Sequence, residues 1–300
     1  MVKARKKSAK KEKIADNIYG WLFSAPLLIG LSVFLFVPLG FAVYYSLTNI
    51  SFTNLDSYSF IGLKNYATAF KDPIFLRSLV NALINCIGVP IGMIIALVLA
   101  NFLSNVKRCS GLFRVIYYIP TICGAAAISY IWLWLYSHDG LINQIITGLG
   151  LESVEFDRGR IFLPSMIIMG VWNGFGVSVL LLFAALKNVS KQLYEAASID
   201  GAGGFKKFFK ISVPAVFPTL FFIIVTGVSG SFQDFARFRI MAASPISDHS
   251  VMPAYLVYDF TNSHDIGKGC AYGILLGLII IFIFVIQNLV QKRLNNNAQG

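Results

Sequence analysis

Long apolar runs constrain the fold of this chain more than any other feature of its sequence. An α-helix needs about 20 predominantly apolar residues to cross the hydrocarbon core of a bilayer, and six runs reach that length. Charged residues make up 13% of the chain, against about 25% in soluble domains, which excludes a soluble fold. We therefore predict an all-α polytopic membrane protein. Its predicted spans are residues 20–47, 79–104, 112–136, 161–186, 215–236 and 270–291.

The distribution of lysine and arginine predicts how these spans are oriented. Short cytoplasmic loops carry an excess of basic residues. Here, 17 of the 25 basic residues fall in residues 1–20, 105–114, 187–210 and 292–293, which lie before the first run, around two alternate connections and after the sixth run. Both termini are therefore expected in the cytoplasm, and the first run, which is too long for a signal peptide, should be retained. The expected parts are a basic N-terminal segment (1–19), a transmembrane domain (20–293) and a cytoplasmic tail (294–300).

The remaining composition excludes several functional classes. The net charge of +11 is spread over short loops between apolar runs, which argues against nucleic-acid binding. The chain has no GxxxxGK[ST] phosphate-binding loop, no GxSxG and no HExxH, so no catalytic residue, bound cofactor or metal is expected. The cysteines lack metal-ligand spacing, and the histidines are scattered over predicted external loops: Cys86, Cys109, Cys123 and Cys270; His138, His249 and His264.

One polar segment, residues 188–214, interrupts the apolar chain between the fourth and fifth runs. Its first part is expected to form a helix whose free amides are capped by the Ser190 hydroxyl. The glycines of GAGG (201–204) should end that helix, and FKKFFKI (205–211) should form a second short amphipathic helix, with Pro214 beginning the next span. By composition alone, an interfacial loop whose lysines bind anionic lipid is the stronger interpretation.

The order of residues in this segment changes that interpretation. YEAASIDGAGGFKKFFKISVPAVFPTL (194–220) closely resembles the EAA loop of binding-protein-dependent ABC importer permeases, with EAA, DGA, a hydrophobic and basic stretch, and I-x-x-P in order. Four other stretches resemble the carbohydrate-uptake, maltose-permease-like subfamily: WLFSAPLLIGLSVFLFVPLGFAVYYSL, FIGLKNYATAF, RVIYYIP and WLWLYSHDGLINQIITGLGL. The chain departs from this subfamily at 241–245, where MAASP replaces a glycine-rich, TGGGP-like stretch that faces the binding protein.

The resemblance implies a permease subunit of an ATP-driven importer for an oligosaccharide or other carbohydrate. Such a subunit forms half of the translocation pathway in a bacterial plasma membrane. It would pair with a second, homologous permease, two ABC ATPase subunits that bind ATP and Mg²⁺, and a solute-binding protein outside the membrane. In this family the EAA loop, here residues 195–214, contacts the ATPase. The implied coupling residues are Glu195, Ala196, Ala197, Asp200 and Gly201.

Polar residues inside the fourth and fifth runs mark a candidate substrate pathway, because polar groups in a bilayer are costly. The resemblance supports these two helices, since maltose-type relatives contact sugar through the corresponding stretches. The alternative for each residue is a hydrogen bond between helices or, for Asp234, a pair with Arg237. The candidates are Trp172, Asn173, Gly174 and Ser178 in the fourth run, and Thr226, Ser229, Gly230, Ser231, Gln233 and Asp234 in the fifth.

Three further expectations concern local structure. GLKNYATAF (62–70) should form a short interfacial helix, and residues 237–269 have the composition of a loop. Glycines spaced four residues apart should let helices pack closely in lipid; these are Gly88 and Gly92, Gly170 and Gly174, and Gly273 and Gly277.

Other functions stay open. The same architecture could import a non-sugar solute such as a peptide, an amino acid or a phosphorylated polyol. An ion-coupled secondary transporter would have ionisable residues inside its spans and an internal repeat, neither of which is evident here. A membrane scaffold that docks a partner through residues 188–214 would transport nothing.

Overall fold

Helices make up nearly all of the computed structural model, which describes residues 17, 19–105, 110–242, 247–263 and 265–297. No strand occurs among these residues, where the extended pairing is a single bridge between Thr48 and Phe60. The all-α prediction is therefore confirmed for the described part of the chain.

Four helices are long and apolar enough to cross a membrane: Tyr19–Ser46, Pro73–Ser104, Gly159–Lys187 and Ile266–Arg293. The first contains a π-helical stretch, η1 (Ser32–Phe36), followed by α2 (Val37–Ser46). The second joins α4 (Pro73–Asn85) to α5 (Gly88–Asn105). The third consists of η2 (Gly159–Ile161) and α9 (Phe162–Lys187), and the fourth belongs to α16 (Ile266–Asn297).

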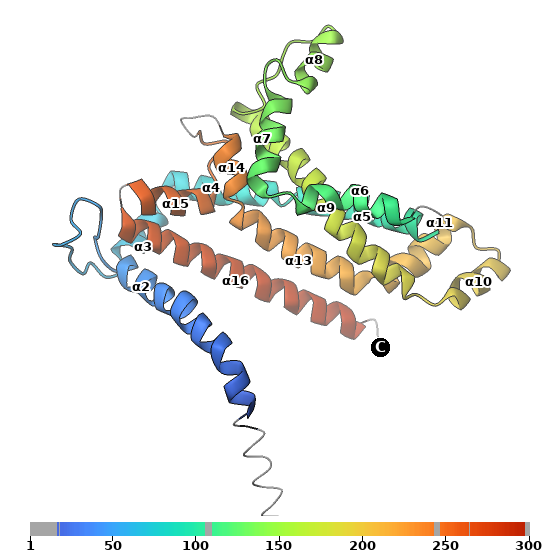
Figure 1. The fold of residues 1–300 in the computed structure, drawn as a ribbon, viewed down its shortest axis with the longest axis horizontal. Coiled ribbons are helices and arrows are strands. Elements are labelled where there is room, and N and C mark those ends of the chain that lie inside the picture. The colour runs from blue at the N-terminus through green and yellow to red at the C-terminus, as the bar shows by residue number, and fades with distance from the viewer. Residues whose placement is uncertain (1–16, 18, 106–109, 243–246, 264, 298–300) are drawn as a thin grey trace, which may run out of the picture.

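The third predicted span is not a continuous helix. It comprises α6 (Ser110–Ile122) and α7 (Ala125–Tyr136), and the chain bends by 109° between them. A proline within a helix lacks the N–H that would bond the carbonyl of the preceding turn, and its ring clashes with that carbonyl. Pro120 lies a few residues before the bend. As a result α7 and α8 (Leu141–Gly148) project away from the helix bundle (Figure 1).

The fifth predicted span is also bent. After α11 (Gly204–Lys207), a π-helical turn η3 (Phe208–Ser212) and α12 (Val213–Ala215), the chain turns by 65° into α13 (Phe217–Gln233). Four unbroken candidates and two bent pairs thus give four to six spans, so the structure supports a multi-pass membrane protein.

Helices also occur in two of the predicted connections between spans. The expected helix at 62–70 is confirmed as α3 (Lys64–Ala69). The prediction of a loop at 237–269 is wrong, because α14 (Ala236–Met241) and α15 (Pro253–Ser263) lie within it. Proline is favourable at the first position of a helix, so Pro253 begins α15 and does not break it.

Close helix packing is centred on α9, which contacts both α5 and α6. A Cβ atom at Gly88 would lie 3.4 Å from the Ile167 side chain, and one at Gly92 would lie 3.8 Å from Val171, so both glycines do face α9. Gly176, which the spacing rule missed, packs still more closely, since a Cβ there would lie 2.1 Å from the Tyr117 carbonyl oxygen. Gly174 and Gly277, in contrast, face open space.

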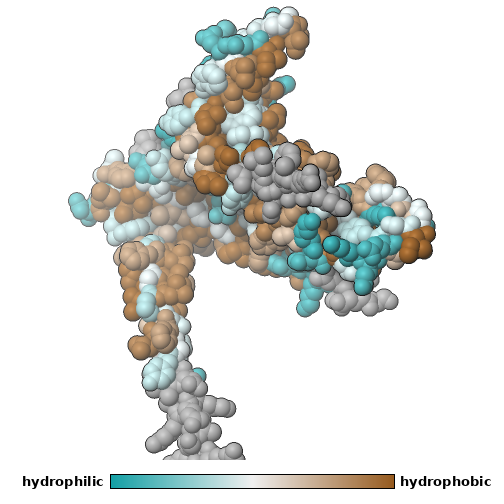
Figure 2. Space-filling view, turned by 45° about the vertical axis from the view of Figure 1, so that its right-hand side comes forward, coloured by the Kyte–Doolittle hydropathy of each residue, from teal (hydrophilic) through white to brown (hydrophobic). Residues whose placement is uncertain are grey.

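The first long helix lies mostly outside this packing. None of the side chains in its most apolar stretch is buried. Its C-terminal part, α2, contacts α16, and its N-terminal part extends away from the bundle (Figure 1). Figure 2 shows that hydrophobic residues cover its outer surface. An exposed surface of this kind is stable where lipid or another membrane helix covers it.

Asp72 ties the start of α4 to the start of α16. Its carboxylate accepts hydrogen bonds from the Ile74 amide at 2.9 Å and from the Tyr272 hydroxyl at 2.6 Å, and Lys268 Nζ lies 3.5 Å away. Burial opposes ionisation of Asp72, but these hydrogen bonds and the Lys268 charge outweigh it and lower its pKa.

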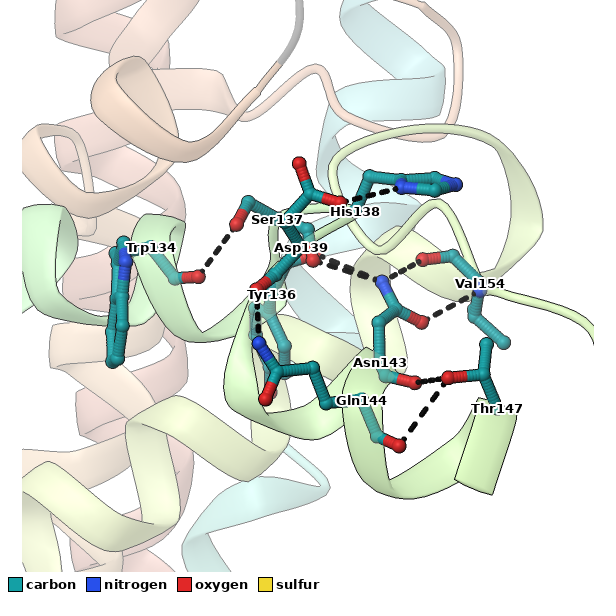
Figure 3. Close-up of polar contacts among 9 residues, drawn as sticks. All are labelled: Trp134, Tyr136, Ser137, His138, Asp139, Asn143, Gln144, Thr147 and Val154. Carbon is teal, nitrogen blue, oxygen red and sulfur yellow. Dashed lines mark hydrogen bonds and ion pairs between the residues drawn. The ribbon is translucent and has the colours of Figure 1, made fainter. Parts of the chain in front are cut away.

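Asn143 holds together the projecting segment around α8 (Figure 3). Its buried amide donates hydrogen bonds to the carbonyls of Ser137 and Val154, both at 3.0 Å, and accepts one from the Val154 amide at 2.8 Å. One side chain thus supplies the hydrogen bonds that the backbone of this irregular segment lacks.

Replacing Asn143 with leucine is expected to loosen residues 137–158 without unfolding the bundle. The variant leaves several backbone groups unpaired at a cost of about 1–3 kcal/mol each where they stay buried. Hydrogen exchange of the purified protein should show faster exchange in this segment. The matched control is Gln144→Ala, which removes one exposed hydrogen bond to the Asp139 carbonyl. Equal protection of residues 137–158 in both variants would contradict the role assigned to Asn143.

Candidate functional site

A cavity of about 480 Å³ lies within the bundle, with walls formed by the end of α4 and by α5, α9 and α13. Ligand pockets in proteins are typically of this order, roughly 300–1,000 Å³. Six glycines line it: Gly88, Gly92, Gly170, Gly174, Gly227 and Gly230. An added Cβ would meet no atom within 4 Å at Gly174 and Gly230, so these two leave space open, whereas the other four allow close contacts with neighbouring residues.

The structure brings seven of the ten candidate pathway residues to this cavity. Asn173, Gly174 and Ser178 reach it from α9, and Thr226, Gly230, Ser231 and Asp234 reach it from α13 and its end. The remaining three do not line it: Trp172, Ser229 and Gln233. Trp172 makes an edge-to-face contact with Trp132 at 5.6 Å, and Gln233 donates a hydrogen bond to the Ser229 carbonyl. Whether any of these residues contacts a solute stays a prediction.

Several polar side chains at the cavity already have partners within the protein. The Thr226 hydroxyl donates to the Phe222 carbonyl at 2.8 Å, and the Ser231 hydroxyl donates to the Gly227 carbonyl at 3.0 Å. Asn173 bridges α9 to the bend after α6, because its amide donates to the Pro120 carbonyl at 3.0 Å. Asn173 therefore makes the bond between helices that was the alternative role for these residues, whereas Thr226 and Ser231 bond within their own helix.

Asp234 and Arg237 form an ion pair at the edge of the cavity. Arg237 Nε donates to Asp234 Oδ1 at 3.1 Å, and a second hydrogen bond joins the other carboxylate oxygen to Nη2. The Asp234 side chain is only 7% exposed, and a buried carboxylate requires such a partner. The Arg237 guanidinium lies against Gly170, where an added Cβ would be 3.2 Å from Nη1. Gly170 therefore makes room for this arginine.

The polar segment between α9 and α13 lies at the other end of the molecule from α3 and α15 (Figure 1). It contains α10 (Lys191–Ile199), a turn, and then α11 and η3, which agrees with the expected helix–turn–helix. Gly201 forms the turn with a φ of +73°, a conformation that suits glycine. The expected cap is wrong, because the Ser190 side chain makes no capping hydrogen bond. The next span begins at Phe217, after Pro214.

The predicted coupling residues lie on the outer surface of this segment. Glu195, Ala196, Asp200 and Gly201 are exposed, and Ala197 is half-buried. Their exposure leaves them accessible to a partner protein. Of the predicted MAASP departure, residues 243–245 lie outside the described part of the chain.

Tyr194 links α10 to the bundle. Its hydroxyl lies 2.9 Å from Ser212 Oγ, and the Ser212 hydroxyl in turn donates to Asn101 Oδ1 at 3.4 Å. Since Ser212 uses its proton toward Asn101, Tyr194 is the donor in the first bond. The three residues connect α10, η3 and α5, and α5 is a wall of the cavity.

These features define a multi-pass membrane protein with an internal, partly polar cavity and a structured loop at one end of the bundle. The chain belongs to the family of binding-protein-dependent transport system inner membrane components, which it matches over residues 88–296. This is a family of ABC transporter permease subunits, and its members are not themselves enzymes.

Two curated relatives and one solved structure illustrate the similarity. The chain is 30% identical to a probable ABC transporter permease protein, YesP, of Bacillus subtilis (strain 168), covering 94% of this chain and 93% of YesP. It is also 30% identical to the arabinooligosaccharides transport system permease protein AraP of Halalkalibacterium halodurans, covering 91% and 87% of the two chains. A bacterial alginate ABC transporter, solved with an alginate pentasaccharide-bound periplasmic protein, has a TM-score of 0.81 at 19% identity and covers 94% and 97%. That likeness shows a shared fold.

Proposed function

We propose that this chain is a permease subunit of an ATP-driven importer of an oligosaccharide or other carbohydrate in a bacterial plasma membrane. The observation that carries the proposal is the cavity between α5, α9 and α13 in a chain of this family. Its lining combines apolar walls with amides and hydroxyls, which suits solutes that present both C–H surfaces and hydroxyl groups. The sugar-transport relatives support the same class of cargo.

The proposed assembly contains four further subunits. A second, homologous permease would complete the pathway, two ABC ATPases would bind ATP and Mg²⁺, and a solute-binding protein would deliver the cargo from outside. Six spans with both termini in the cytoplasm would place α10 and α11 on the ATPase side. The basic residues of this loop support that orientation, since cytoplasmic loops are enriched in lysine and arginine.

Coupling to the ATPases would use the exposed residues of α10 and its turn: Glu195, Ala196, Ala197, Asp200 and Gly201. Coupling requires an element whose position depends on the state of the ATPase and which is itself connected to the pathway. The contacts of Tyr194 with Ser212 and of Ser212 with Asn101 support such a connection, because they lead from α10 to a wall of the cavity.

Replacing Tyr194 with phenylalanine should reduce the amount of solute imported for each ATP hydrolysed by about three- to tenfold, because the variant keeps the ring and loses a partly buried hydrogen bond. Uptake and ATP hydrolysis of the reconstituted complex would be measured together. Ser198→Ala is the matched control, since its hydroxyl binds Lys207 within the loop and does not reach the bundle. An unchanged ratio of imported solute to hydrolysed ATP in Tyr194→Phe would refute coupling through the contact between Tyr194 and Ser212.

The experiment that tests the proposed function is a pull-down of the tagged chain from gently solubilised membranes, with the bound subunits identified by mass spectrometry. Recovery of an ABC ATPase and a second permease is expected, followed by uptake of sugars from a panel in the reconstituted complex. A chain that purifies alone as a homo-oligomer would favour a secondary transporter or a scaffold. A complete complex that imports a peptide, amino acid or phosphorylated polyol would keep the importer and change its cargo.

A further inference from the structure

Asn85 is a polar residue of the cavity that none of the sequence patterns singled out. It is the last residue of α4, immediately before the break that separates α4 from α5. It lines the cavity, and only 8% of its surface is exposed. Within the described part of the chain, its side chain makes no hydrogen bond. Its amide atoms are not fully enclosed by protein, so they are open to the cavity and available to a molecule that enters it.

This lack of a partner distinguishes Asn85 from three other polar residues of the cavity. Thr226 and Ser231 donate their hydroxyl protons to carbonyls of their own helix, and Asn173 donates to the Pro120 carbonyl. Ser178 resembles Asn85, since it lines the cavity from α9 and its hydroxyl makes no hydrogen bond with a described residue. Hydrogen-bonding capacity is therefore free at two places on the cavity wall.

The charges at the cavity indicate what kind of group would bind there. Asp234 and Arg237, the charged side chains among the described lining residues, neutralise each other. An amide offers donors and an acceptor together, and a hydroxyl group does the same. A site with free amide and hydroxyl groups and no unpaired charge matches an uncharged, hydroxyl-rich molecule better than an anion or a cation.

We propose that Asn85, together with Ser178, binds hydroxyl groups of an uncharged saccharide as it passes through the cavity, which makes Asn85 a residue that determines specificity. The inference rests on the proposed function for the class of cargo. It adds a contact from α4, outside the two helices to which the sequence assigned the pathway. A site that hydrogen-bonds a hydroxyl discriminates against an analogue that lacks it, because the protein group is then left unpaired.

The test uses the intact importer complex in proteoliposomes, with its binding protein, and a panel of uncharged oligosaccharides with their monodeoxy analogues. Asn85→Leu removes the amide at similar size, and the control Thr261→Val removes a hydroxyl that is bonded within α15 and lies outside the cavity. We expect Asn85→Leu to lower uptake of the parent sugar by about tenfold. It should also abolish the preference for that sugar over one deoxy analogue, whereas Thr261→Val keeps both properties. Ser178→Ala should change the discrimination against a different monodeoxy analogue, the one that lacks the sugar hydroxyl bound by Ser178.

Two results would overturn the inference. One is an equal loss for every analogue in Asn85→Leu, which would mean that Asn85 supports the structure or an ordered water. The other is uptake and discrimination as in the wild type. If the wild-type complex imports no saccharide, the proposed cargo is wrong. The same two variants are then compared on analogues of the solute that it does import, and an unchanged discrimination in Asn85→Leu again overturns the inference.

Discussion

Replacing Gly201 with valine is expected to reduce ATP-driven uptake by about tenfold or more while the chain still inserts and folds. Gly201 has a φ of +73°, and an L-residue pays about 1–2 kcal/mol in this region, with β-branched residues disfavoured most. An added Cβ would meet no atom within 4 Å, so the expected effect comes from the backbone. The turn would open and change the angle between α10 and α11. Uptake and ATP hydrolysis of the reconstituted complex measure this loss.

The control for this prediction is Gly203→Val, two residues away in the same turn. Gly203 has a φ of −66°, which other residues adopt freely, and an added Cβ there also meets open space. Uptake by Gly203→Val should stay close to that of the wild type. Normal uptake by Gly201→Val would show that the conformation of this turn does not matter for coupling.

Replacing Gly176 with alanine is expected to produce the largest loss of stability. A Cβ at this position would lie 2.1 Å from the Tyr117 carbonyl oxygen and 3.0 Å from Thr121 Oγ1. Backbone atoms cannot rotate away, so α6 would have to move off α9. Overpacking of this kind typically costs about 1–3 kcal/mol, and sometimes more. Displacement of α6 would also break the Thr121–Asn173 hydrogen bond of 2.9 Å.

Thermal unfolding in detergent, together with the yield of monodisperse protein, measures this effect. The matched control is Gly174→Ala on the same helix, because Gly174 faces the cavity and an added Cβ there meets nothing within 4 Å. We expect a clearly lower melting temperature for Gly176→Ala than for Gly174→Ala. Equal melting temperatures would mean that α6 and α9 are not in the close contact described.

Local features of this protein could be predicted well from the order of its residues. The helical character of the apolar runs, the short helix α3 and the turn at Gly201 all follow from hydropathy or from the backbone preference of a single residue. The predictions were wrong where the same residue type is compatible with two local structures. The composition of residues 237–269 suggested a loop, yet Pro253 begins α15 within it, and the Ser190 position suggested a cap that the side chain does not provide.

The sequence by itself determined that the chain is helical, crosses a membrane and carries the polar loop of a known permease family, because these properties depend on residues that are close together in the chain. Only the tertiary structure decided which polar groups are free at the cavity. Thr226 and Asn85 are both uncharged polar residues in apolar surroundings, yet the first is bonded within its helix and the second is not. The Thr226 bond is local, but the position of Asn85 depends on contacts between helices distant in sequence, since the packing of α4, α5, α9 and α13 forms the cavity that its side chain lines.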